Sequence, residues 1–153
     1  MATAWDRIDL GGGTVPMPAN DEEYRPSADE PFMGPRQQAY FRAKLYDWKA
    51  AIKREAAETL SQLQVDTLHE ADLTDRASSE TDWGIELRTR DRQRKLISKI
   101  DAALRRIDEG EYGYCEVTGE PIGLARLEAR PIATMTIEAQ ERHERAERSS
   151  RED

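Results

Sequence analysis

This chain of 153 residues has little of what stabilises a compact or a secreted protein. It contains one cysteine, so no disulfide can form within it, and only 37% of its residues are hydrophobic, with a mean hydropathy of −0.86. That composition is meagre for a large buried core. No run of about 18 apolar residues occurs, and the first residues show no basic stretch followed by an apolar one. We therefore expect a soluble, cytoplasmic protein that is not exported and has no membrane partner.

Catalytic side chains are also scarce. His69 and His143 stand alone, and Cys115 has no predicted base beside it, so no nucleophile with a base and an orienting group is visible. The chain has 31 acidic residues against 23 Lys and Arg, and the net charge of −8 opposes general affinity for phosphate backbones. We do not expect an enzyme, and a protein partner is favoured over DNA.

Two long amphipathic stretches occupy the middle of the chain. Apolar residues recur there at the helical steps of three and four, at Phe41, Leu45, Trp48, Ile52, Ala56, Leu60 and Leu63 and then at Trp83, Leu87, Leu96 or Ile97, Ile100, Leu104 and Ile107. The two patterns mirror each other around residue 74, so Phe41 would face Ile107 and Val65 would face Trp83. We expect an antiparallel coiled-coil hairpin of two helices, each roughly 50 Å long, with its tip at residues 72–77.

The segments around this hairpin differ from it in composition. Pro35 suits the first turn of a helix, and Gly110 is a helix stop. Residues 1–34 carry four prolines and seven acids against two bases, so we expect an extended, mobile N-terminal arm. The predicted fold class is mainly α: a hairpin over 35–110, a small zinc-finger-like knuckle over 111–134, and a C-terminal helix with a frayed tail over 135–153.

Charge is distributed unevenly along the predicted hairpin. Residues 55–86 hold nine acids and one base, whereas residues 36–54 hold six bases and one acid, and residues 87–106 hold eight bases and two acids. The tip is therefore acidic and the stem basic. Charge runs are usually solvated helix faces, but this segregation also suits a partner with opposite charges: basic where it meets the tip and acidic where it meets the stem. A nucleic-acid-binding module is a further interpretation, opposed by the lack of interleaved aromatics, and it would use the cluster Arg88, Arg90, Arg92, Arg94 and Lys95.

The knuckle is dense in glycine and turn residues, and it has the spacing of a metal site. Cys115, Thr118, Thr136 and Ala139 stand at the positions of a C-x2-C-x17-C-x2-C zinc site that has lost three of its four thiols. We expect no bound zinc: the two threonine hydroxyls should bond to turn backbone instead. Packing should come from Tyr112, Tyr114, Ile122, Leu124, Leu127, Ile132 and Ile137. A metal site completed by Glu138 and His143 is a disfavoured alternative.

Several motifs together carry a resemblance to a known family. They are the D-x-x-D-x-A pattern of residues 72–77, the run of residues 86–92, and the knuckle sequences of residues 112–116, 122–123 and 126–131. They resemble the DksA/TraR family of bacterial transcription factors over about residues 33 to 145. The resemblance implies a factor that binds RNA polymerase through its secondary channel without binding DNA. Such a factor regulates initiation at rRNA and other promoters in the stringent response, together with ppGpp.

The resemblance also implies roles for individual residues. The coiled-coil tip, placed near the polymerase active site, would act through Asp72, Asp75 and Ala77. Arg92 would contact the channel rim. A ppGpp pocket shared with polymerase would involve Leu96, Lys99, Arg130 and Gln140, the last in place of a basic residue. The implied state is a monomer that binds no cofactor by itself. The alternative is a Gre-like factor, whose tip carboxylates would hold Mg²⁺ for transcript cleavage; the knuckle motif argues against it.

Overall fold

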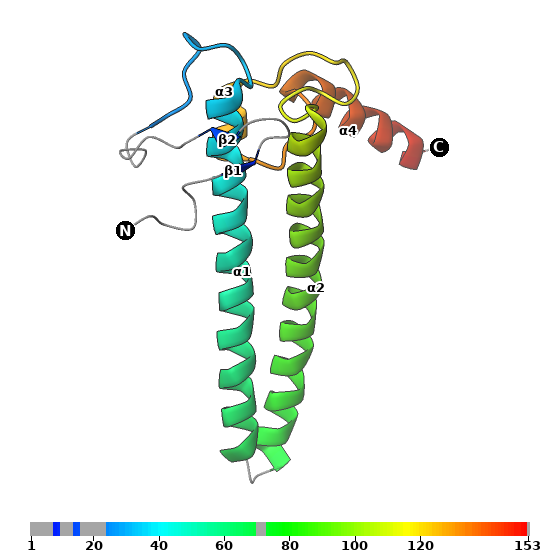
Figure 1. The fold of residues 1–153 in the computed structure, drawn as a ribbon. Coiled ribbons are helices and arrows are strands. Elements are labelled where there is room, and N and C mark those ends of the chain that lie inside the picture. Colours follow the sequence, from blue (N-terminus) through cyan, green and yellow to red (C-terminus); the bar gives the residue numbers. More distant parts are fainter. Residues whose placement is uncertain (1–7, 10–13, 16–23, 70–72, 153) are drawn as a thin grey trace. The chain divides into compact units, whose positions relative to one another are not determined.

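Over the residues that it describes, a computed structural model has four helices and one short β-ribbon (Figure 1). It describes the backbone of residues 8–9, 14–15, 24–69 and 73–152, and the side chains of 24–66 and 80–151. The elements are β1 (Ile8–Asp9), β2 (Thr14–Val15), α1 (Pro35–His69), α2 (Leu73–Glu109), α3 (Leu124–Ala129) and α4 (Ile137–Glu152). The mainly α fold class is confirmed, and α1 begins at Pro35 while α2 ends at Glu109, next to Gly110. Within the described ranges, none of the helices is long and apolar enough to cross a membrane.

Three local features differ from the expectations. β1 and β2 pair antiparallel, with Ile8 opposite Val15, inside the segment expected to be an extended arm. Helix α3 forms inside the predicted knuckle, which was expected to be dense in turns. Helix α4 continues to Glu152, so the described part of the predicted frayed tail is helical. Its many i, i+4 pairs of opposite charge, such as Arg145 with Glu141, explain why the helix continues.

The chain divides into two compact units. One contains residues 1–45 and 102–153, and we call it the knuckle unit; the other contains residues 46–101, and we call it the hairpin unit. In the hairpin unit α1 and α2 run antiparallel (Figure 1). The Lys49 ammonium lies 2.6 Å from the Asp101 carboxylate, close to the predicted register of the two helices.

The seam of the hairpin unit follows a regular heptad pattern. Its α2 positions alternate steps of three and four, and they are Trp83, Glu86, Arg90, Gln93, Ile97 and Ile100. The assignment of Leu87 to this seam is therefore wrong: Leu87 is 61% exposed, whereas Glu86 is 8% exposed. Val65, which the mirror pattern places opposite Trp83, is exposed as well. Helix geometry fixes which positions face inward, and an apolar side chain one residue away from the seam stays in solvent.

Polar side chains therefore occupy part of this seam. The Arg90 guanidinium lies 3.4 Å from the Glu86 carboxylate and donates across the hairpin to the Ala56 carbonyl oxygen at 3.5 Å. Gln93 Oε1 is buried with no hydrogen-bond partner among the described residues. Polar groups at such positions fix the register of a coiled coil and lower its stability. The Arg90 bond to Ala56 is thus a polar contact between α1 and α2 in this part of the seam.

The knuckle unit has an apolar core of its own. Its buried members are Phe41, Leu45, Leu104, Ile107, Tyr112, Ile122 and Leu127. The Phe41 and Tyr112 rings lie 5.6 Å apart, and the Tyr112 hydroxyl donates to the Pro131 carbonyl oxygen at 2.7 Å. The predicted packing of the knuckle is confirmed for Tyr112 and Leu127 but is wrong for Ile137, which is exposed. Ile137 is the first residue of α4, and the buried residues beside it are Thr136 and Ala139.

Residues 24–34, which we call the strap, pack onto the knuckle. The buried Gln37 side chain accepts the Met33 N–H at 2.9 Å and donates to the Ser27 carbonyl oxygen at 3.2 Å. Met33 is buried, and the Phe32 ring meets the Tyr114 ring edge-on at 5.3 Å. The expectation of an extended arm is therefore wrong for this part. A proline-rich composition does not reveal that one buried amide can bond two turns at once.

Candidate functional site

The zinc-like positions of the knuckle lie in a tight double turn. The Cys115 N–H donates to the Glu120 carbonyl oxygen, and the Gly119 N–H donates to the Cys115 carbonyl oxygen, both at 2.8 Å. The Glu116 N–H donates to the Thr134 carbonyl oxygen at 2.9 Å, which joins this turn to the segment before α4. These backbone bonds therefore hold the segment around Cys115 next to the segment before α4.

The Cys115 thiol is buried in this turn as a free cysteine. Burial raises its pKa, but hydrogen bonds from the Thr118 hydroxyl and from the backbone N–H groups of Thr136, Thr118 and Val117 outweigh burial and lower the pKa to about 7. Backbone N–H groups aimed at one sulfur stabilise a thiolate. The structure thus brings Cys115, Thr118 and Thr136 together, as their spacing predicts.

The threonines bond to turn backbone, which confirms their predicted role. Thr118 Oγ accepts the Glu120 N–H, and Thr136 Oγ accepts the Ala139 N–H at the start of α4, both at 3.3 Å. The second bond is a helix N-cap, and such a cap stabilises a helix by about 1 kcal/mol.

The residues present do not fit a structural zinc ion. Such an ion takes four ligands, usually Cys or His, and here one thiol stands with two hydroxyls and a methyl group. His143 lies 3.4 Å from Glu147. Across the side chains that the structure describes, no three His, Cys, Asp or Glu gather at one point.

Polar contacts fix the knuckle to the ends of the long helices. The Arg106 guanidinium donates to the Tyr114 carbonyl oxygen at 2.7 Å and to the Glu111 carbonyl oxygen at 3.2 Å. The Glu128 carboxylate accepts from the Lys44 ammonium at 2.9 Å and from the Tyr40 hydroxyl. Burial raises the pKa of Glu128, but these two donors lower it below its usual value overall. These contacts join the knuckle to residues of α1 and α2.

The remaining predicted site residues lie in different parts of the chain. Asp72 and the side chains of Asp75 and Ala77 are outside the described residues. Exposed Arg92 and Lys99 and half-buried Leu96 lie on α2 in the hairpin unit. Exposed Arg130 and half-buried Gln140 belong to the knuckle unit, and the Gln140 amide donates to the Glu144 carboxylate at 2.8 Å.

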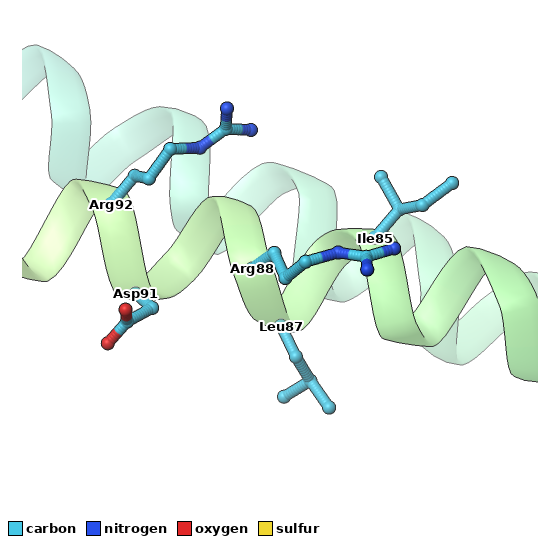
Figure 2. Close-up of a pocket in the computed structure, with 5 residues that line it drawn as sticks. All are labelled: Ile85, Leu87, Arg88, Asp91 and Arg92. Carbon is cyan, nitrogen blue, oxygen red and sulfur yellow. The ribbon is translucent and has the colours of Figure 1, made fainter. Parts of the chain in front are cut away.

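A surface that the sequence reasoning missed lies on α2 in the hairpin unit. A shallow hollow of about 570 Å³ is lined by Ile85, Leu87, Arg88, Asp91 and Arg92. In Figure 2, where α1 lies behind α2, Arg92 and Ile85 point to one side of α2, Leu87 and Asp91 point to the other side, and Arg88 lies between them on the outer face. Counting heptads back from Ile100 would have placed Leu87 on this face.

The two modules define a class of protein: a coiled-coil hairpin joined to a zinc-finger-type knuckle. Residues 37–107 match the N-terminal domain of the DnaK suppressor protein DksA, and residues 110–145 match the prokaryotic dksA/traR C4-type zinc finger. The chain belongs to the DksA family.

Relatives match along both modules. The RNA polymerase-binding transcription factor DksA of Caulobacter vibrioides is 66% identical over 140 residues, which are 92% of this chain and 99% of that relative. The factor of the same name from Escherichia coli K12 is 39% identical over 120 residues, covering 78% of this chain and 80% of the relative. The solved structure of the transcription factor DksA2 from Pseudomonas aeruginosa is similar with a TM-score of 0.72 and 40% identity, over 81% of this chain and 94% of that one.

Proposed function

We propose that this protein is a cytoplasmic transcription factor that binds RNA polymerase through its secondary channel and regulates initiation without contacting DNA. The observation that carries the proposal is 66% identity, over nearly the whole of both chains, to a factor whose name states that it binds RNA polymerase. The acidic excess of the whole chain agrees with a protein partner. A Gre-like role in transcript cleavage is not favoured, because relatives and family matches all point to DksA.

The charge pattern supports an insertion with the tip first. Acids are concentrated over residues 55–86, around the proposed tip, and bases follow over residues 87–106. A basic stem would meet an acidic rim, and tip carboxylates would meet the cations of the catalytic centre. Affinity would then reside mainly in the stem, and the effect on transcription in the tip.

Crosslinking from the tip tests this placement directly. A photo-crosslinking amino acid at position 77 should label polymerase segments around the active site, and the same group at the exposed position 117 of the knuckle should not. Labelling of DNA, or of the outer polymerase surface alone, would contradict the proposal.

We infer further that the knuckle folds without zinc. A structural zinc ion contributes about 10 kcal/mol to a small metal-dependent module. The support for a zinc-free fold is that the Thr118 and Thr136 hydroxyls bond to the backbone of the knuckle and that the Phe32 ring packs on the Tyr114 ring. The protein should purify with well under one zinc per chain and should keep its helicity in a strong chelator. Circular dichroism with elemental analysis checks both; stoichiometric zinc, or unfolding on chelation, would refute the inference.

The ppGpp response should be present but reduced. Lys99 and Arg130 are retained at the proposed shared pocket, whereas Gln140 stands where the resemblance places a cation. Gln140→Lys should therefore strengthen the ppGpp effect in transcription assays at equal occupancy of polymerase. Glu144→Ala is the matched control, because it removes the oxygen that accepts from the Gln140 amide without placing a cation at position 140. An unchanged response in Gln140→Lys would show that position 140 takes no part in the pocket.

A further inference from the structure

The strap is a loop that is held together by hydrogen bonds of its own. The Tyr24 hydroxyl donates to the Glu30 carboxylate at 2.7 Å, and the Glu30 N–H donates to the Ser27 carbonyl oxygen at 3.3 Å. The same carboxylate accepts the Ser27 N–H, also at 3.3 Å. Because these contacts lie within the strap, they persist when the strap moves as one piece about its junction with α1.

The backbone at this junction is strained. Met33 has a φ of +50°, in the left-handed region that disfavours every residue with a Cβ. Two successive side chains of α1 hold it there: Gln37 accepts the Met33 N–H at 2.9 Å, and Gln38 donates to the Met33 carbonyl oxygen at 2.7 Å. A strained conformation persists only where its surroundings fix it. These two amides therefore keep the strap closed.

The closed strap covers the start of the turn that contains Cys115. The Phe32 ring packs edge-on against the Tyr114 ring, at 5.3 Å between centroids. The Met33 side chain lies so close to Gly113 that a Cβ added there would be 2.9 Å from Met33 Cγ. The Cys115 side chain, next along the chain, is buried. The strap thus presses on one side of the turn that encloses the thiol.

Backbone hydrogen bonds join this side of the turn to the other. The Ile122 N–H donates to the Gly113 carbonyl oxygen at 2.7 Å, and the Cys115 N–H donates to the Glu120 carbonyl oxygen at 2.8 Å. Release of the strap removes the apolar cover from residues 113–114, so that side can part from residues 120–122 more readily. Opening of the strap and opening of the turn are therefore coupled.

Little apolar burial opposes release of the strap. Of residues 24–34, Met33 alone is buried, and the others are half-buried or exposed. Release also relieves the left-handed backbone of Met33, and Gly34 beside it gives the chain the freedom to turn. Segments with little burial open at lower free energy than the core of the protein.

We propose that the strap is a latch, which opens as a unit about Met33 and Gly34 and controls how often the Cys115 turn opens to solvent. With the latch closed, the turn is ordered and the thiol is shielded. With the latch open, Phe32 and Met33 leave the knuckle, and the side-chain amide of Gln37 binds water instead of the strap. The inference goes beyond the proposed binding to polymerase, and its test uses the free protein alone.

The rate at which an aromatic disulfide reagent labels the full-length protein tests the latch, because Cys115 is the only thiol. Gln37→Leu removes the amide that bonds both Met33 and Ser27, so labelling should become about tenfold faster or more. Gln64→Leu, the same change at an exposed position of α1 in the hairpin unit, is the matched control and should label at the original rate. Equal rates in Gln37→Leu and the unsubstituted protein would overturn the proposal.

Low concentrations of urea distinguish opening of the latch from unfolding of the whole chain, and this measurement needs no variant. Opening the latch exposes little surface, so the labelling rate of the unsubstituted protein should rise only slightly with urea. A rise as steep as that of the unfolding equilibrium would assign exposure of Cys115 to global unfolding and contradict the latch, even where Gln37→Leu does not fold.

Phe32→Ala separates the latch from independent opening of the turn. It removes the ring that covers Tyr114 and leaves the bonds within the turn in place. Labelling should again become faster, with the same shallow dependence on urea. An unchanged rate in Phe32→Ala would show that the turn opens without the strap, and the latch would be wrong.

Discussion

Asp75→Asn is expected to leave binding to RNA polymerase nearly intact and to remove most of the effect on transcription. The substitution keeps the size of the side chain and removes its charge, at the tip where the proposed contact with the catalytic centre is made. Losing one partner of a close charged contact in a dry site costs roughly 2 to 5 kcal/mol, so the effect should fall tenfold or more. Affinity should change little, because the cations that would supply it lie on the stem.

Competition binding and promoter-complex lifetime, measured on the same preparations, separate the two effects. Asp82→Asn is the matched control, since it removes one acid from an exposed position of the same acidic stretch. It should alter neither property. An equal loss of binding and of activity in Asp75→Asn would contradict the division between tip and stem.

Gly113→Ala is expected to be the most destabilising small substitution in the knuckle. Gly113 has a φ of +89°, and an added Cβ would lie 2.9 Å from Met33 Cγ and 3.2 Å from Phe32 Cζ. The backbone conformation costs an alanine about 1–2 kcal/mol, and overpacking adds about 1–3 kcal/mol. The free energy of unfolding should therefore fall by roughly 2–5 kcal/mol, as measured by urea denaturation.

Two other glycines of the chain separate these causes. Gly119 has a φ of +73°, and a Cβ added there would have nothing within 4 Å. Gly119→Ala should therefore lower the free energy of unfolding only by the cost of the backbone conformation. Gly84 lies inside α2, and a Cβ added there would have nothing within 4 Å. Because alanine favours a helix more than glycine does, Gly84→Ala should stabilise the protein by up to about 1 kcal/mol. A loss at Gly113 no larger than the loss at Gly119 would show that the strap does not press on the knuckle.

The sequence predicted the features that repeat and missed those that depend on single contacts. The two long helices were found because many apolar residues share one period. Leu87 was misplaced because its apolar character outweighed the heptad register, which assigns the inward position to Glu86. The strap was missed because it depends on the side-chain amide of Gln37, and no local pattern marks that residue as buried.

The knuckle shows the same division. The spacing of Cys115, Thr118 and Thr136 predicted which residues meet, and the threonine hydroxyls bond as expected. The lowered pKa of Cys115 was not predictable, because it comes from the Thr118 hydroxyl and from backbone N–H groups whose directions only the folded turn sets. Exposed Ile137 was misassigned since its place at the start of α4 turns it outward.

The polar seam positions Glu86, Arg90 and Gln93 should make local opening of the hairpin easier. These three seam positions carry polar side chains, so this part of the coiled coil buries less apolar surface than the knuckle unit does at Phe41 and Leu104. Backbone amides near residues 86–93 should therefore exchange with solvent deuterium by local opening, at lower free energy than amides near residue 104. The hairpin can then separate and reclose in its outer part while the knuckle stays folded. On entering a narrow channel, the coiled coil could therefore bend or open locally near residues 86–93 instead of keeping one rigid shape.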